Sequence, residues 1–286
     1  MRRIRIQSLS VVHCATRLLN LSLTSAIGLS LLLIVALPTL LAPWLAPYDP
    51  NALTVGPRLA SPSLDHPFGT DGLGRDQLAR VLYGGRVALG VASLVLAISV
   101  AVGTLVGSIA GYLGGRTDEI ISFLLNIVLT LPGLSLTLAL VAFIGPGAGS
   151  LILALTATAW AGYARLFRGA VLATRQQLFV EAARSYGATN GRIILRHIVP
   201  NVARPILALA SLNLSSVMLA LAGLSYLGIG VQPPTADWGT MLSDARPYLR
   251  SAPHLAIPPA LCIIAVALGA TLLADGLLAD DRREIQ

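Results

Sequence analysis

Residues 87–113 read VALGVASLVLAISVAVGTLVGSIAGYL and contain no charged side chain. A helix needs about 20 predominantly apolar residues to cross the hydrocarbon core of a bilayer, and this stretch is longer than that. Five other apolar stretches also reach this length, so the sequence predicts an all-α, polytopic membrane protein with six transmembrane helices. The expected spans are Leu21–Ala42, Val87–Leu113, Ile120–Ile144, Leu151–Val171, Ile206–Leu227 and Leu255–Ala274.

The overall composition supports the same prediction. Apolar residues make up 55% of the chain, charged residues make up 12%, and the mean hydropathy is +0.76. A soluble domain carries roughly 25% charged residues to keep its surface in water. Most of the surface of this protein is therefore expected to face lipid or other protein.

Lysine is missing from the sequence, because all twenty basic residues are arginine. A P-loop places a Lys on the β- and γ-phosphates, and Schiff-base chemistry needs a Lys amine. We therefore predict that the chain is not an enzyme of either kind and does not itself hydrolyse ATP. Cys14 and Cys262 are far apart in sequence, and they predict neither a disulfide framework nor a metal site.

The arginines are unevenly distributed between the two sides of the predicted bundle. If the N-terminus is cytoplasmic, fourteen arginines lie on that side and six on the other. Short loops rich in Arg stay in the cytoplasm, so both termini are expected inside, and the basic excess does not indicate binding of nucleic acid. The predicted divisions are a cytoplasmic segment 1–20, a first span with its external loop 21–86, a five-span core 87–278 that includes a cytoplasmic loop 173–205, and a cytoplasmic tail 279–286.

A glycine repeat follows one face of the second predicted span. Gly103, Gly107, Gly111 and Gly115 are spaced four residues apart, which places them on one side of a helix. Small residues in a membrane helix allow a second backbone to approach closely. We expect these glycines to serve helix packing within the chain.

The Arg-rich cytoplasmic loop contains the run FVEAARSYG at residues 179–187 and the run IVP at residues 198–200. This pattern predicts two short helices, because Gly187 supplies the positive φ that favours a helix end and Pro200 stops the second helix. Ala182 and Ala183 are small enough for another protein to approach, and Glu181 offers a carboxylate. The spacing alone fits both a solvated helical hairpin and a docking surface.

The same residues carry a resemblance to a known family. Glu-Ala-Ala, three residues, Gly, ten residues and Ile-x-Pro resembles the EAA loop of permeases in binding-protein-dependent ABC importers. The runs HPFGTD at 66–71, AGYLGG at 110–115, LSYLG at 224–228 and QPPT at 232–235 are similar to the "C" subunit of the dipeptide/oligopeptide/nickel permease subfamily. The resemblance implies that the loop is a coupling helix that docks into an ATPase, with coupling residues Glu181, Ala182, Ala183, Gly187, Ile198 and Pro200.

The resemblance further implies the ABC importer permease (MetI-like) fold and uptake of small peptides across the bacterial inner membrane. The expected partners are a second, homologous permease chain in a heterodimer, two ATP-binding cassette ATPase domains, an extracytoplasmic solute-binding protein and membrane lipid. ATP and magnesium are expected on the partner ATPases, so no cofactor and no metal are expected in this chain. The external loop is expected to help receive the binding protein through Gln232, Pro233, Pro234, Asp237 and Trp238, although Trp238 also fits an anchor at the lipid interface.

Three positions depart from the subfamily pattern. Members often carry an Arg and an Asp in the third span, where this chain has Phe123 and Asn126, and many peptide permeases carry a Glu where this chain has Leu221. Nickel permeases of the subfamily can also lack that Glu, so uptake of nickel or a metal chelate is the alternative function.

Two other classes of membrane protein fit the sequence less well. A secondary transporter or channel needs ionisable groups near the bilayer midplane, where Asn126 is nearly the only polar candidate. A membrane enzyme needs catalytic groups at depth, and no histidine falls inside a predicted span. The four histidines are His13, His66, His197 and His254.

Overall fold

The computed structural model describes residues 22–178, 180, 185, 187, 189–193 and 203–285. Within these residues every regular element is a helix, which confirms the all-α prediction. The longer helices are α2 Leu23–Leu40, α4 Gln77–Leu113, α5 Gly115–Thr130, α6 Gly133–Ile144, α7 Ala148–Arg175, α11 Ala203–Tyr226 and α13 Ile257–Ile285. The short ones are α3 Ala42–Leu45, α9 Asn190–Ile193, α12 Trp238–Ala245, η2 Arg246–Tyr248 and η3 Pro253–Leu255.

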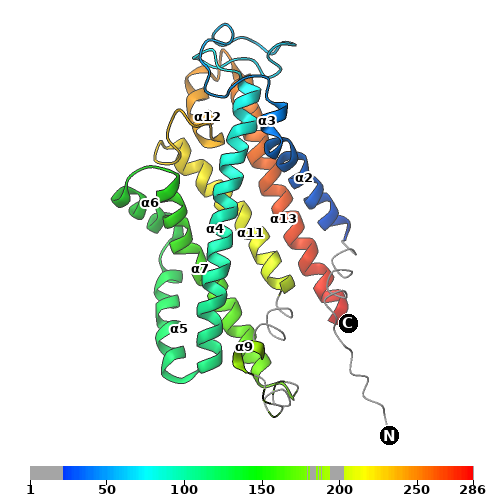
Figure 1. Ribbon diagram of the computed structural model, residues 1–286, viewed down its shortest axis with the longest axis vertical. Coiled ribbons are helices and arrows are strands. Elements are labelled where there is room, and N and C mark those ends of the chain that lie inside the picture. The colour runs from blue at the N-terminus through cyan, green and yellow to red at the C-terminus, as the bar shows by residue number, and fades with distance from the viewer. Residues whose placement is uncertain are drawn as a thin grey trace.

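The long helices run up and down one elongated bundle (Figure 1). Five of those in the described part of the chain are long and apolar enough to cross a membrane, and the bent pair of α5 and α6 supplies a sixth crossing if it counts as one span. The helices α2 and α13 lie side by side, and α13 ends toward the end of the bundle where α4 turns into α5 (Figure 1). The opposite end carries α12 and the segment 46–76, which we call the lobe.

The third predicted span is the one that the structure corrects. Instead of one continuous helix from Ile120 to Ile144, the chain forms α5 and α6, which meet at an angle of 89°. Proline disfavours helical backbone in the residue before it and lacks an N–H to donate. Leu131 accordingly has extended backbone, with ψ of 137°, directly before Pro132.

The helices α4 and α7 pack closely through the predicted glycine repeat. A Cβ atom on Gly103 would lie 2.8 Å from the carbonyl oxygen of Trp160, and one on Gly111 would lie 2.8 Å from the carbonyl oxygen of Arg168. Gly115 lies at the turn between α4 and α5 with φ of 53°, and a Cβ there would have no atom within 4 Å. Three of the four glycines thus contact α7, while Gly115 serves the turn.

The lobe end of the bundle is more regular than the sequence indicates. The helix α4 starts at Gln77, ten residues before the predicted span, because the Asp76 side chain accepts a hydrogen bond from the Ala79 N–H at 2.8 Å and caps the helix. The proline-containing segment 228–254 lies between two predicted spans, and it forms the further helix α12, whose N-terminus is capped by Asp237. Both differences arise from an aspartate cap that satisfies the free N–H groups of a helix start.

Candidate functional site

A cavity of about 610 Å³ lies between α6, α7 and α11 in the membrane-spanning part. Its wall is mostly apolar, and its lining contains no ionisable side chain among the described residues. Hydroxyl and amide groups provide the hydrogen-bonding capacity of the lining, from Thr137, Thr158, Asn213 and Ser216. A cavity of this kind can hold a solute through neutral hydrogen bonds and apolar contact.

None of the three positions that depart from the subfamily pattern lines this cavity. Leu221 is buried, with 1% exposure, in the helical core, whereas Phe123 is 65% exposed on α5. The side chain of Asn126 accepts a hydrogen bond from Arg165 Nη2 at 2.9 Å. The neutral character of the cavity therefore comes from other residues, and sequence reasoning missed them because they are ordinary apolar and small polar side chains of three helices.

Two arginines of α7 fasten α5 to the bundle. Arg165 binds Asn126, and Arg168 makes a two-pronged contact with Asp118, in which Nη2 donates to Oδ2 at 2.7 Å and Nε donates to Oδ1. A guanidinium that binds a carboxylate through two N–H groups is among the stronger charged pairs. The sequence contained the signal, since opposite charges near the same ends of neighbouring antiparallel spans can meet.

Most of the predicted coupling residues lie outside the described residues: Glu181, Ala182, Ala183, Ile198 and Pro200. Gly187 is described, and it is exposed with φ of 78°, the left-handed conformation that favours glycine. A Cβ atom at Gly187 would meet no other atom within 4 Å, so the backbone conformation, rather than space, restricts the residue type. The docking role of this loop stays a prediction.

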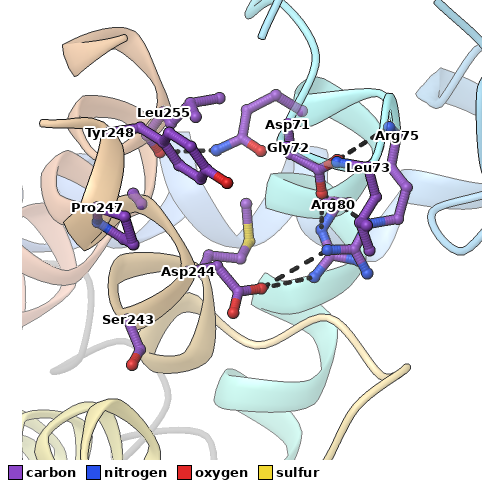
Figure 2. A pocket seen from close by; sticks show the side chains of 13 residues that line it. Asp71, Gly72, Leu73, Arg75, Arg80, Ser243, Asp244, Pro247, Tyr248 and Leu255 are labelled. Carbon is purple, nitrogen blue, oxygen red and sulfur yellow. Dashed lines mark hydrogen bonds and ion pairs between the residues drawn. The ribbon is translucent and has the colours of Figure 1, made fainter. Parts of the chain in front are cut away.

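At the other end of the bundle, buried polar and charged side chains contact one another within the lobe. The carboxylate of Asp76 lies 2.9 Å from His66 Nδ1 and is fully buried. Asp71 accepts from Arg75 Nε at 2.6 Å, and both side chains are about nine-tenths buried. Figure 2 shows Asp71, Arg75 and Arg80 gathered opposite Asp244 of α12. The lobe, the start of α4 and α12 thus bring four charged side chains together.

The five predicted residues of the external loop divide into two groups. Gln232, Pro233 and Pro234 are exposed, as a receiving surface requires. Asp237 and Trp238 are each 1% exposed, which corrects the expectation that the Trp238 ring faces a partner or the lipid interface. Instead, Trp238 Nε1 donates to the carbonyl oxygen of Val81 at 2.9 Å and anchors α12 to α4.

The cap of α12 gives a pH-dependent prediction. Burial raises the pKa of the Asp237 carboxyl above its usual value, while hydrogen bonds from Ser225, Thr240 and Gly239 oppose the rise. The folded chain then binds a proton more readily than the unfolded chain, so the ionised carboxylate lowers the folding stability at neutral pH. That penalty is absent below the unfolded pKa near 3.8 and grows as the pH rises through the folded pKa.

We expect Asp237→Asn to be at least as stable as the wild type at neutral pH and to show a flatter dependence of stability on pH. The amide oxygen still accepts from the Gly239 and Thr240 N–H groups, which the carboxylate binds at 3.0 and 3.4 Å. Asp237→Ala loses the cap and should be less stable than Asp237→Asn by about 1 kcal/mol. Thermal unfolding from acid to neutral pH measures both effects, and equal stability of the two variants would contradict the capping role.

Comparison with known proteins identifies the class of this bundle. The family "Binding-protein-dependent transport system inner membrane component" matches residues 103–279. The chain belongs to this family. The permease is also 40% identical over 259 residues to the glutathione transport system permease protein GsiD of Escherichia coli O6:K15:H31 (strain 536 / UPEC), covering 90% of this chain and 84% of that protein. GsiD of Shigella flexneri serotype 5b (strain 8401) is 41% identical over the same length, with the same coverage of both chains.

Among solved structures, the permease resembles a chain of the inward-facing MetNI methionine ABC transporter, with a TM-score of 0.48 and 20% identity. The match covers 71% of this permease and 96% of that chain. The family assignment confirms the resemblance drawn from the EAA loop and the MetI-like fold. This permease is therefore a multi-pass inner-membrane subunit of an ABC importer that works with ATPases and a binding protein.

Proposed function

We propose that this permease translocates small peptides of the glutathione or dipeptide class into the cell. The observation that carries the proposal is its 40% identity to a glutathione transport system permease over 90% of the chain. The neutral cavity between α6, α7 and α11 supports the same class of solute. Its hydroxyl and amide groups match the peptide bonds of a small peptide, whose N–H and C=O groups need partners once they leave water.

The coupling loop and the orientation belong to the same proposal. The Arg-rich residues around Gly187 face the cytoplasm, where Glu181, Ala182 and Ala183 contact the ATPase, and the lobe faces the outside. ATP binding and hydrolysis on two partner ATPase domains then move the coupling loop and open the bundle alternately to the two sides.

The neutral cavity also motivates the proposal of a second, non-identical permease chain. Moving a charged group through an apolar environment without a counter-charge or hydrogen bonds costs several kcal/mol. A peptide carries charged termini, and the described lining of this cavity offers them no opposite charge. The counter-charges are therefore assigned to the partner permease, and the transporter is a heterodimer.

Uptake of nickel or a metal chelate remains the second candidate, because the Glu that many peptide permeases carry is replaced by Leu221. A bare divalent cation is more strongly hydrated than the same metal in a chelate. A neutral cavity compensates poorly for the hydration that the bare cation loses. A chelate masks that charge, so the chelated metal is the form of this alternative that the cavity favours.

Reconstituted uptake tests the proposal. The permease, its partner permease, the ATPases and the binding protein are placed in proteoliposomes, and ATP-dependent uptake of labelled glutathione, a labelled dipeptide and nickel is compared. We expect uptake of a peptide that excess unlabelled peptide suppresses, and no uptake when the partner permease is omitted. Nickel uptake without peptide uptake would replace the peptide proposal, and robust uptake by a complex with this permease alone would refute the heterodimer.

A further inference from the structure

A second cavity, of about 320 Å³, lies where the lobe meets α12. Its wall combines Asp71, Arg75 and Arg80 from the lobe and the start of α4 with Asp244 and Tyr248 from the opposite side (Figure 2). It shares no lining residue with the cavity between α6, α7 and α11. This pocket therefore lies outside the site assigned above to the transported solute.

The two arginines of the pocket are buried but incompletely bound. Arg75 is 7% exposed and Arg80 is 3% exposed. Arg75 Nε donates to Asp71 at 2.6 Å, and Arg80 Nη1 reaches the carbonyl oxygen of Pro50 at 3.3 Å. Among the described residues the other guanidinium nitrogens make no further hydrogen bond, although Arg80 Nε lies 3.6 Å from Asp71 Oδ2 and so shares that carboxylate with Arg75. Buried guanidinium groups usually bind carboxylates through paired N–H groups, so these donors lack the partner that their chemistry favours.

Asp244 occupies the position of that partner only loosely. Its Oδ2 atom lies 3.6 Å from Arg75 Nη2 and 3.9 Å from Arg80 Nη2, beyond the usual length of a hydrogen bond. The side chain of Asp244 is 56% exposed, whereas that of Asp71, which binds Arg75 tightly, is 10% exposed. Asp244 can turn into solvent with little loss of contact, and Asp71 cannot.

The charges determine which ligand fits. Two positive arginines face one firmly bound carboxylate, that of Asp71, which leaves a single positive charge once Asp244 turns away. A carboxylate brings one negative charge and two oxygens in a plane, which matches two neighbouring guanidinium groups. A doubly charged anion such as phosphate would overcompensate the site.

We propose that this pocket binds a carboxylate group presented from the lobe side, which replaces Asp244 against Arg75 and Arg80. The carboxylate belongs either to a free small molecule or to an acidic side chain of the protein that docks on the lobe. In both cases Asp244 acts as a built-in competitor that holds the pocket until the ligand arrives. This site is separate from the cavity assigned to the transported solute, and the proposal does not depend on which solute is transported.

Acetate titration decides the proposal. Thermal unfolding of the purified transporter is followed in increasing acetate, with chloride replacing acetate at constant ionic strength and pH. Asp244→Asn removes the competing carboxylate. In the absence of acetate this variant should be less stable to heat than the wild type, because two buried arginines lose a counter-charge. Acetate should then restore the stability, with half-saturation at a several-fold lower concentration than in the wild type.

The matched control is Asp65→Asn, which removes an exposed carboxylate of the same lobe outside the pocket. This variant should respond to acetate as the wild type does. A response to acetate that is absent, or equal in Asp244→Asn and the wild type, overturns the proposal. A purely structural role of Asp244 predicts that result, because acetate would not then compensate the lost carboxylate.

A second measurement assigns the source of the carboxylate. ATP hydrolysis by the reconstituted transporter is measured against the concentrations of binding protein and of solute. If Asp244→Asn lowers only the half-saturating concentration of binding protein, the carboxylate is a side chain of that protein. A shift confined to the solute assigns it to the solute, and no shift in either assigns it to a free carboxylate of the medium. Failure of peptide uptake would leave the acetate result unaffected.

Discussion

Gly107→Ala is expected to destabilise the folded permease by about 1 to 3 kcal/mol, although alanine is the better helix former. The new Cβ atom would overlap the carbonyl oxygen of Ala164 on α7 and would lie 2.9 Å from Phe167 Cβ. A backbone carbonyl in the middle of a helix cannot move aside without shifting the whole helix. We therefore expect α4 and α7 to separate, with loss of the packing that connects the core of the bundle.

Gly90→Ala is the matched control, because it makes the same chemical change in the same helix. A Cβ atom at Gly90 would have no other atom within 4 Å. The higher helix propensity of alanine should then leave the stability unchanged or raise it by about 0.5 to 1 kcal/mol. Unfolding of the purified protein in detergent measures both variants, and equal effects at the two positions would show that α4 and α7 are not as close as the structure places them.

The sequence predicted the helices better than their interruptions. Hydropathy identifies spans because it depends only on composition within a window, and the spans around residues 87–113 and 255–274 were located in this way. An average of hydropathy does not register a bend in the backbone. Residues 120–144 were therefore predicted as one continuous span, although the helix is interrupted at Pro132. Pro132 itself indicated a break in the helix, but the apolar character of the neighbouring residues outweighed this indication.

Long-range contacts were the part that the sequence could not supply. The charged cluster of the lobe joins Asp71, Arg75 and Arg80 to Asp244, more than 160 residues further along the chain. No spacing rule connects residues so distant, because their meeting depends on how α12 packs against α4. Trp238 illustrates the same limit, since an amphipathic ring on a predicted loop becomes the buried anchor of that packing.

Gly187→Val is expected to weaken association with the ATPase and to reduce transport strongly, while the amount of protein in the membrane stays normal. Gly187 has φ of 78°, and an L-residue in this conformation pays roughly 1 to 2 kcal/mol, most of all a β-branched one. The space around the position is open, so the cost comes from the backbone and changes the direction in which the chain leaves the turn. A penalty of about 1.4 kcal/mol corresponds to a tenfold weaker association.

Gly187→Asn separates this backbone effect from a simple loss of glycine. Asparagine tolerates the left-handed conformation far better than valine, so the Asn variant should keep most of the transport and the ATPase association. Co-purification of the ATPase and uptake into vesicles provide the two readouts. Normal transport and association in Gly187→Val would refute the coupling role, because a docking segment that tolerates redirection of its turn does not transmit the motion of the ATPase. Equal loss in the Val and Asn variants would instead place a direct contact at the glycine itself, where the partner approaches too closely for any side chain.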